Sequence, residues 1–202
     1  MKSFIFYFLI LVTSSLFGQG NVKSSHFIIN NSYPIPIGNN FMNDKSVFGD
    51  DVMQYVGIDA CGIGYNYNVI GNFNIGMNLR YSYLLNKSKY ITNTGNINSA
   101  LTFNYNYLKG KFQFIPQINF GYSNFKFFQK DEKATSTSDL SINAFTVSSQ
   151  MQVLYSLTNN LSLGISVAYD NTWLEKSDIV PNIAYNRNLQ FLYPGICMDF
   201  KI

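Results

Sequence analysis

The chain carries little charge, little cysteine and almost no histidine. Only 12% of its 202 residues are charged, whereas about 25% is usual for a soluble domain. The net charge of +3 is too small to indicate a nucleic-acid partner. Two cysteines are too few for a disulfide-rich secreted scaffold, and one histidine beside them leaves no pair of ligands at zinc spacing. We therefore expect neither a resident metal nor a cofactor.

Long apolar runs are also absent. Past the N-terminal segment, no run approaches the roughly 20 residues that a membrane-spanning helix needs. Disorder is excluded as well, because 47% of the residues are hydrophobic and 17% are aromatic. The residue in surplus is asparagine, which occurs 26 times although it disfavours helices and regular strands. The apolar residues are dispersed along the chain, so the fold has to be inferred from their spacing.

The first 18 residues predict a secretory signal peptide. Lys2 provides a positive charge, the nine residues Phe4–Val12 form an apolar stretch, and Gly18 is a small residue at the expected cleavage point. Nine apolar residues are too few for a membrane anchor. We expect cleavage after Gly18, so that residues 1–18 are the signal peptide and residues 19–202 form one exported domain.

From residue 24 onward, apolar and polar residues alternate with the period of two that is typical of β-strands. In the last segment, Leu189 and Phe191 have the opposite parity to the apolar residues that follow, which predicts a β-bulge near Pro194 and Gly195. Eight strands are predicted in all. The five clear ones have apolar faces over residues 73–83, 97–107, 112–122, 145–157 and 161–169, and the three weaker ones cover residues 27–35, 53–68 and 189–202.

The connections between these strands alternate strictly between long and short. The long, polar ones are residues 37–52, 86–96, 129–140 and 174–182, and the short ones are residues 69–71, 109–111 and 158–160. An up-and-down barrel places alternate connections at opposite rims, so the four long ones share one rim. This arrangement is typical of transmembrane β-barrels.

The two faces of the strands support the same interpretation. A lipid-exposed sheet has to close on itself so that every backbone group is hydrogen-bonded, and eight strands leave an interior that side chains can fill. Asparagine, glutamine, serine, threonine and glycine on the polar face suit that interior. The aromatic residues form two belts. One lies beside the short turns (Tyr65, Tyr67, Phe73, Tyr105, Tyr107, Phe112, Phe114 and Tyr155) and the other toward the long loops (Tyr81, Tyr83, Phe120, Tyr122, Phe145, Tyr169 and Trp173).

The sequence therefore predicts an all-β fold, a closed antiparallel up-and-down eight-stranded transmembrane β-barrel. A soluble β-sandwich or a lipocalin-like barrel would explain the alternation, but not the loop asymmetry or the two belts. Inside the barrel, Arg80 and Asp170 fall on the polar parity at similar heights. Because buried charges need partners, we expect them to form a polar cluster that plugs the lumen. The expected cluster consists of Arg80, Asp170, Asn78, Asn104 and Gln117.

The pattern resembles the small eight-stranded outer-membrane barrels of the OmpX-like and OmpA-barrel type. The resemblance rests on the strand count, the belts, residues 32–38 at the end of the first strand, and an apolar alternating last strand with Phe200 and Ile202. It implies a bacterial outer membrane, with both termini periplasmic. It also implies contacts with outer-membrane lipid and lipopolysaccharide, and with the barrel-assembly machinery during insertion.

Residues that could carry chemistry are scarce. Enzymes among such barrels use a histidine near the extracellular rim, whereas His26 begins the first strand and is expected to be structural. Cys61 and Cys197 lie on the second and eighth strands, about 10 Å apart across the first strand, and should be free thiols. No catalytic residue is predicted. We expect a non-enzymatic barrel with a structural or surface-interaction role through its long loops, whose extracellular ligand is left open. A small-solute pore or ligand carrier and a lipid A-modifying enzyme are the alternatives.

Overall fold

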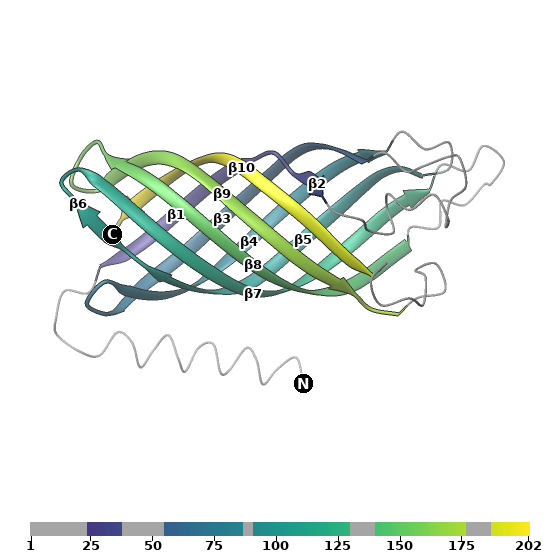
Figure 1. Cartoon of the computed structure of the whole chain (residues 1–202), viewed down its shortest axis with the longest axis horizontal. Coiled ribbons are helices and arrows are strands. Elements are labelled where there is room, and N and C mark those ends of the chain that lie inside the picture. The colour runs from purple at the N-terminus through teal and green to yellow at the C-terminus, as the bar shows by residue number, and fades with distance from the viewer. Residues whose placement is uncertain (1–23, 38–54, 87–90, 130–139, 177–186) are drawn as a thin grey trace.

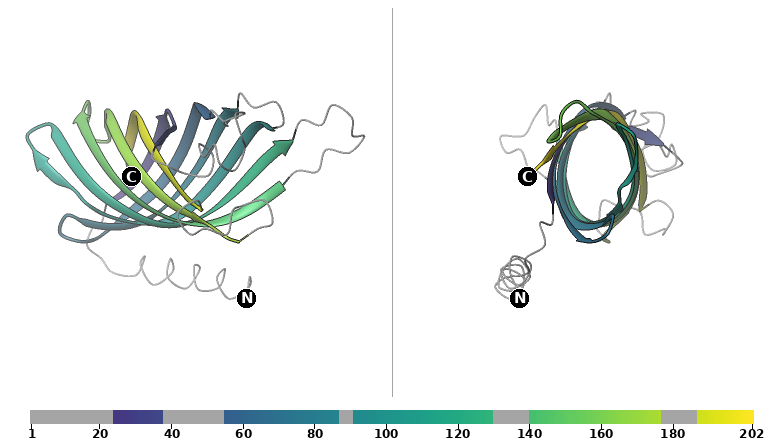
Figure 2. Two further views of the ribbon diagram at one scale, coloured as in Figure 1. Left: turned by 45° about the vertical axis from the view of Figure 1, so that its right-hand side comes forward. Right: turned by 90° about the vertical axis from the view of Figure 1, so that its left-hand side faces the viewer.

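The strands of the protein close into a single antiparallel barrel. The computed structural model describes residues 24–37, 55–86, 91–129, 140–176 and 187–202. The strands are β1 (Ser25–Ser32), β2 (Ile35–Ile37), β3 (Tyr55–Ile70), β4 (Phe73–Asn86), β5 (Ile91–Tyr105), β6 (Tyr107–Lys109), β7 (Phe112–Gln129), β8 (Leu140–Ser156), β9 (Leu161–Leu174) and β10 (Asn188–Lys201). Their hydrogen-bonded order is β1-β3-β4-β5-β7-β8-β9-β10, and β1 pairs with β10 to complete the ring (Figures 1 and 2). Among the described residues, no helix is long and apolar enough to cross a membrane.

Two of the eight positions in the ring are each occupied by two strands in line. β1 and β2 share one position, because Ser32 pairs with Gly195 and Ile35 with Leu192 in one continuous register along β10. β5 and β6 share another along β7, interrupted only at Asn106. The sequence-based prediction of an all-β, closed, eight-stranded antiparallel barrel is therefore confirmed. The signal peptide predicted at residues 1–18 lies outside the described residues.

The predicted bulge near Pro194 and Gly195 is wrong. β10 pairs with β9 from Asn188 to Phe200 without any register shift, and its pairing with β1 is equally regular. Leu189, Phe191 and Tyr193 do not need a bulge, because they point into the barrel and are at most 1% exposed. The parity change reflects an apolar interior at this level. The register shifts that the described strands contain lie in β3 and β5.

The short turns all lie at one end of the barrel, together with the start of β1 and the end of β10 (Figure 1). Gly71 and Gly110 have φ values of 56° and 64° and are first in their two-residue turns, the position that a type II′ hairpin reserves for glycine. At the other end, the predicted connection over residues 86–96 is too long. β5 begins at Ile91, because Thr94, Asn96 and Asn98 continue the inward polar face of the strand.

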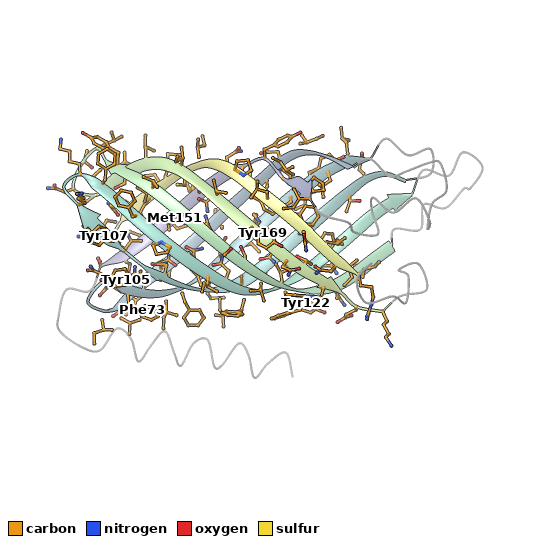
Figure 3. All side chains as sticks on the ribbon, in the orientation of Figure 1. Phe73, Tyr105, Tyr107, Tyr122, Met151 and Tyr169 are labelled. Carbon is orange, nitrogen blue, oxygen red and sulfur yellow. The ribbon has the colours of Figure 1, made fainter. Side chains whose placement is uncertain are left out.

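The outer wall of the barrel is apolar along the middle of the strands. Met77, Leu101 and Ile118 are about half exposed, at 46%, 52% and 50%. Figure 3 shows Phe73, Tyr105 and Tyr107 near the end with the short turns and Tyr122 nearer the opposite end. A soluble protein would bury these side chains, whereas a lipid bilayer favours an apolar belt between aromatic rims.

Several described glycines are required by a close approach of two backbones, and Gly164 is an example. A Cβ atom at Gly164 in β9 would lie 1.9 Å from the carbonyl oxygen of Val153 and 2.8 Å from the Cα of Leu154, both in β8. Gly164→Ala is therefore expected to disrupt the β8–β9 ladder and to lower the free energy of unfolding by about 3 kcal/mol. Gly62→Ala is the control, because the nearest atom to its Cβ is 3.5 Å away, an ordinary contact. Urea titration of both variants in phospholipid vesicles measures the difference, and equal midpoints would contradict the steric argument.

Candidate functional site

The candidate site is the lumen of the barrel, and its side chains change character along the axis. β4 runs from the turn-side end to the loop-side end, and its buried inward residues follow the order Asn74, Arg80, Ser82 and Leu84. β7 and β8 follow a similar course, from Gln117 and Gln150 to Phe125 and Ile142. In contrast, β5 has a buried polar residue, Thr94, near its loop-side end, and a small apolar cluster of Ile115, Leu154 and Cys197 lies toward the short turns. The lumen therefore contains an amide-rich region near the short turns, a charged level above it, and an apolar layer near the long connections.

The charged level is an ion pair that crosses the barrel. The guanidinium Nη2 of Arg80 in β4 donates to Oδ2 of Asp170 in β9. These two strands lie opposite each other in the ring, four positions apart in either direction, so the pair spans the lumen. Arg80 is 9% exposed and Asp170 is 1% exposed. The guanidinium also lies 3.9 Å from the ring centroid of Tyr193 in β10, a cation–π contact that ties a third strand to the pair.

The apolar layer closes the lumen between the ion pair and the loop-side rim. Phe125 in β7 stacks on Phe191 in β10 with 6.4 Å between the ring centroids, and Phe191 contacts Tyr193 at 6.0 Å. The sequence predicts an interior mainly of asparagine, glutamine, serine, threonine and glycine, and at this level large apolar side chains occupy much of it instead. The reason is that side chains shielded from both water and lipid pack best as an apolar core. The buried apolar cluster that forms this layer comprises Ala60, Leu84, Phe125, Ile142, Ala144, Ala168, Leu174, Leu189, Phe191 and Tyr193. Its lower edge, Ala168 and Tyr193, lies one inward position to the turn side of Asp170.

The amide-rich region toward the short turns is a hydrogen-bonded network. The Nδ2 of Asn74 donates to Oδ1 of Asn104 at 2.7 Å. The Nε2 of Gln117 donates to Oδ1 of Asn119 at 2.8 Å and to Oε1 of Gln150 at 3.0 Å. Such a network gives many polar side chains a partner without a wide channel, which accounts for the surplus of asparagine that the composition shows. Nδ2 of Asn104 and Oε1 of Gln152 are exceptions, because they are buried without a hydrogen-bond partner among the described residues.

The predicted polar cluster is thus divided between two levels. Arg80 and Asp170 contact each other directly, whereas Asn104 and Gln117 lie in the amide network as cross-strand neighbours of β5 and β7. Asn78 lies one inward position below Arg80 on β4, and its Oδ1 atom is buried without a hydrogen-bond partner in the described part of the chain.

A hydrogen-bonded histidine–carboxylate pair near the turn-side end was not predicted from the sequence. His26 in β1 lies 2.9 Å from Asp199 in β10, measured between Nδ1 and Oδ2, and so joins the first and last strands of the ring. His26 also lines a cavity of about 530 Å³ at the turn-side mouth. His26 was singled out as structural, but Asp199 was missed, because only the register of the closing strands brings two residues so distant in sequence together.

The two cysteines are free thiols, as predicted from the sequence. Both flank β1, since Cys61 in β3 pairs with Asn31 and Cys197 in β10 pairs with Asn30. Successive residues of a strand point to opposite faces, and Cys61 accordingly is exposed on the outer wall while Cys197 is buried inside. Among the described residues, no group of three or more histidine, cysteine, aspartate or glutamate side chains is placed to hold a metal.

Comparison with solved structures gives the fold a context. The chain is similar to Neisserial surface protein A, with a TM-score of 0.53, 11% identity, and coverage of 89% of this chain and 97% of that one. A major outer membrane protein from Thermus thermophilus matches with a TM-score of 0.57, 12% identity, and coverage of 89% and 98%. The outer membrane protein OprG from Pseudomonas aeruginosa matches with a TM-score of 0.51, 11% identity, and coverage of 89% and 97%. No family model and no curated protein matches the chain. The fold is that of the small eight-stranded outer-membrane β-barrels.

Proposed function

We propose that the protein is a non-conducting barrel of the bacterial outer membrane that anchors its long loop-side connections at the cell surface for a structural or interaction role. The observation that carries this proposal is the blocked lumen, in which the Arg80–Asp170 pair spans the barrel beneath a buried apolar layer. A barrel of eight strands has little interior space beyond what these side chains fill.

The location rests on the outer wall and on the fold. A belt of half-exposed apolar residues between aromatic rims suits a bilayer, and the similar solved structures include outer membrane proteins. In this setting the short turns and both ends of the barrel chain face the periplasm. The wall contacts outer-membrane lipid and lipopolysaccharide, and the barrel-assembly machinery inserts the chain. The connections at residues 38–54, 130–139 and 177–186 carry the surface role. Binding experiments have to identify their ligand.

A lipid A-modifying enzyme with its site at the extracellular rim is the less favoured function. Such a site needs a base near the long connections. The sequence contains one histidine, His26, and the structure places it at the opposite end.

The proposed function predicts that the purified barrel shows no steady single-channel current in planar lipid bilayers. The positive control is a Phe125→Ala/Phe191→Ala variant, which removes the two stacked rings of the apolar layer and should pass current more often than the unsubstituted protein. Steady conductance of the unsubstituted barrel would favour the pore or ligand carrier instead. A second experiment removes residues 38–54 or 177–186 and asks whether binding of cells to a surface changes while the barrel still folds.

A further inference from the structure

Three polar side chains form a hydrogen-bonded row at the turn-side mouth of the barrel, in the order Ser24, His26 and Asp199. Asp199 of β10 lies 2.9 Å from Nδ1 of His26 in β1, and Nε2 of the same ring lies 3.4 Å from Oγ of Ser24, the residue that precedes β1. Asp199 is 3% exposed, so the acid is on the buried side of the histidine and the hydroxyl is on its open side. A nucleophile, a base and an orienting acid in this order form the arrangement used for nucleophilic catalysis.

The hydrogen bonds bear on which ring nitrogen of a neutral His26 carries the proton. An ionised carboxylate only accepts hydrogen bonds, so the proton of neutral His26 resides on Nδ1, where it is donated to Asp199. Nε2 is then the unprotonated nitrogen, and it faces the Ser24 hydroxyl. This tautomer is the one in which a histidine can accept a proton from a serine. A distance of 3.4 Å between Nε2 and Oγ is longer than a strong hydrogen bond, which is common at such sites before substrate binds.

The row opens onto a cavity rather than onto packed side chains. Ser24 and His26 both line the turn-side cavity, whose volume of about 530 Å³ lies within the range of small-molecule sites. Most of the lining is amide and hydroxyl. The Oδ1 atom of Asn106 in this lining is buried and has no hydrogen-bond partner among the described residues, so it offers an acceptor to a hydroxyl group.

We propose that Ser24 is the nucleophile of a hydrolytic site that cleaves short-chain carboxylic esters of polar, hydroxyl-bearing alcohols. The Oγ of Ser24 bonds to the ester carbonyl carbon and its proton passes to Nε2 of His26. The bond from the carbonyl carbon to the alcohol oxygen then breaks, and the alcohol leaves with that proton. Water attacks the acyl-serine, His26 takes a proton from it and returns it to Ser24, and the carboxylic acid departs. One ester and one water thus give one acid and one alcohol.

The lining selects the substrate class. Leu108 and Leu157 are the large apolar side chains of the cavity, which is too little apolar surface for a long acyl chain. The amides of Asn74 and Gln113 already donate to Asn104, Ser156 and Ser162. Lys111 and Lys201 are the cationic side chains of the lining, and positive charge of this kind stabilises an oxyanion. This activity goes beyond the proposed anchoring role and lies at the opposite end of the barrel. It differs from the sequence-based expectation that the chain has no catalytic residue, and the experiments below decide between the two.

The test uses the folded full-length barrel in a detergent without ester bonds. A fluorophosphonate probe should label Ser24, as located by mass spectrometry, and p-nitrophenyl acetate should be hydrolysed faster than p-nitrophenyl palmitate. Ser24→Ala and His26→Ala should each lower the acetate rate by about a hundredfold. Ser25→Ala is the matched control, because the Ser25 hydroxyl instead contacts the Tyr65 hydroxyl at 2.8 Å in an exposed position. Absence of labelling, labelling that persists in Ser24→Ala, or equal loss in Ser25→Ala would overturn the proposal.

Asp199 acts in this site as a positioning residue, and its contribution is tested separately. Asp199→Asn should lower the hydrolysis rate and move the His26 proton from Nδ1, which ring ¹⁵N chemical shifts report, while Asp199→Glu should restore part of the rate. A heat-modifiable gel shift checks that every variant is folded. A reduced rate with an unchanged His26 tautomer would contradict the positioning role. None of these readouts depends on conductance or on the loops, so their failure would leave the anchoring function untouched.

Discussion

An Arg80→Ala barrel is expected to unfold with a free energy about 3–5 kcal/mol below that of the unsubstituted protein. The substitution leaves the Asp170 carboxylate buried without its countercharge, at 1% exposure. It also removes the guanidinium 3.9 Å from the Tyr193 ring and the ion pair that joins opposite walls of the barrel. The single tryptophan, Trp173, lies on the outer wall near the loop-side rim and reports unfolding in urea by its fluorescence.

Two further variants test whether the loss of stability in Arg80→Ala comes from the unpaired Asp170 carboxylate or from removal of a positive charge as such. Arg80→Met/Asp170→Leu replaces both charges with apolar groups of similar size and should recover most of the stability, because a buried pair is costly to break but not to replace. Lys126→Ala removes the same charge from an exposed position on β7 and should leave the unfolding midpoint unchanged. If the double replacement unfolds as easily as Arg80→Ala, the loss comes from packing and not from an uncompensated charge.

The Arg80–Asp170 contact also shows how much of the site can be predicted from the sequence. Alternation of apolar and polar residues sets the inward parity of each strand, and the strict order of long and short connections sets an up-and-down ring of eight. In such a ring the third and seventh strands face each other, so an arginine and an aspartate at similar heights on those strands can meet across the lumen. The pairing follows from parity and topology alone, without knowledge of any side-chain conformation.

Of the two features that were missed, one depends on a quantity that the sequence pattern does not contain, and the other left a signal in that pattern. The His26–Asp199 pair arises from the register of the strands that close the ring, and that register depends on the shear of the whole barrel. The apolar layer reverses the expected polarity because inward positions near the loop-side rim are shielded from water by their neighbours. Leu84, Phe125 and Phe191 all lie on the polar parity of their strands, and this repeated exception was the available signal.

The levels of the lumen place the two proposed roles of the barrel at opposite ends of its axis. The amide network near the turns leaves a polar cavity, and the ion pair and apolar layer above it separate that cavity from the loop-side rim. The proposed chemistry at the turn-side mouth and the proposed interactions at the loops can therefore be altered independently, since no described side chain belongs to both.

The apolar layer should behave as the core of the protein even though it lies inside a barrel in a membrane. Phe191→Ala is expected to lower the free energy of unfolding by about 3–5 kcal/mol, because Phe191 is 1% exposed and its removal leaves a cavity between Phe125 and Tyr193. The matched control is Phe120→Ala on the outer wall, where the side chain is 45% exposed and lipid can fill the vacated space. That variant should lose about 1 kcal/mol, mostly from its edge-to-face contact with Phe103. Urea titrations in vesicles compare the two. Equal losses would mean that the lipid-facing wall, and not the interior layer, carries the stability of this barrel.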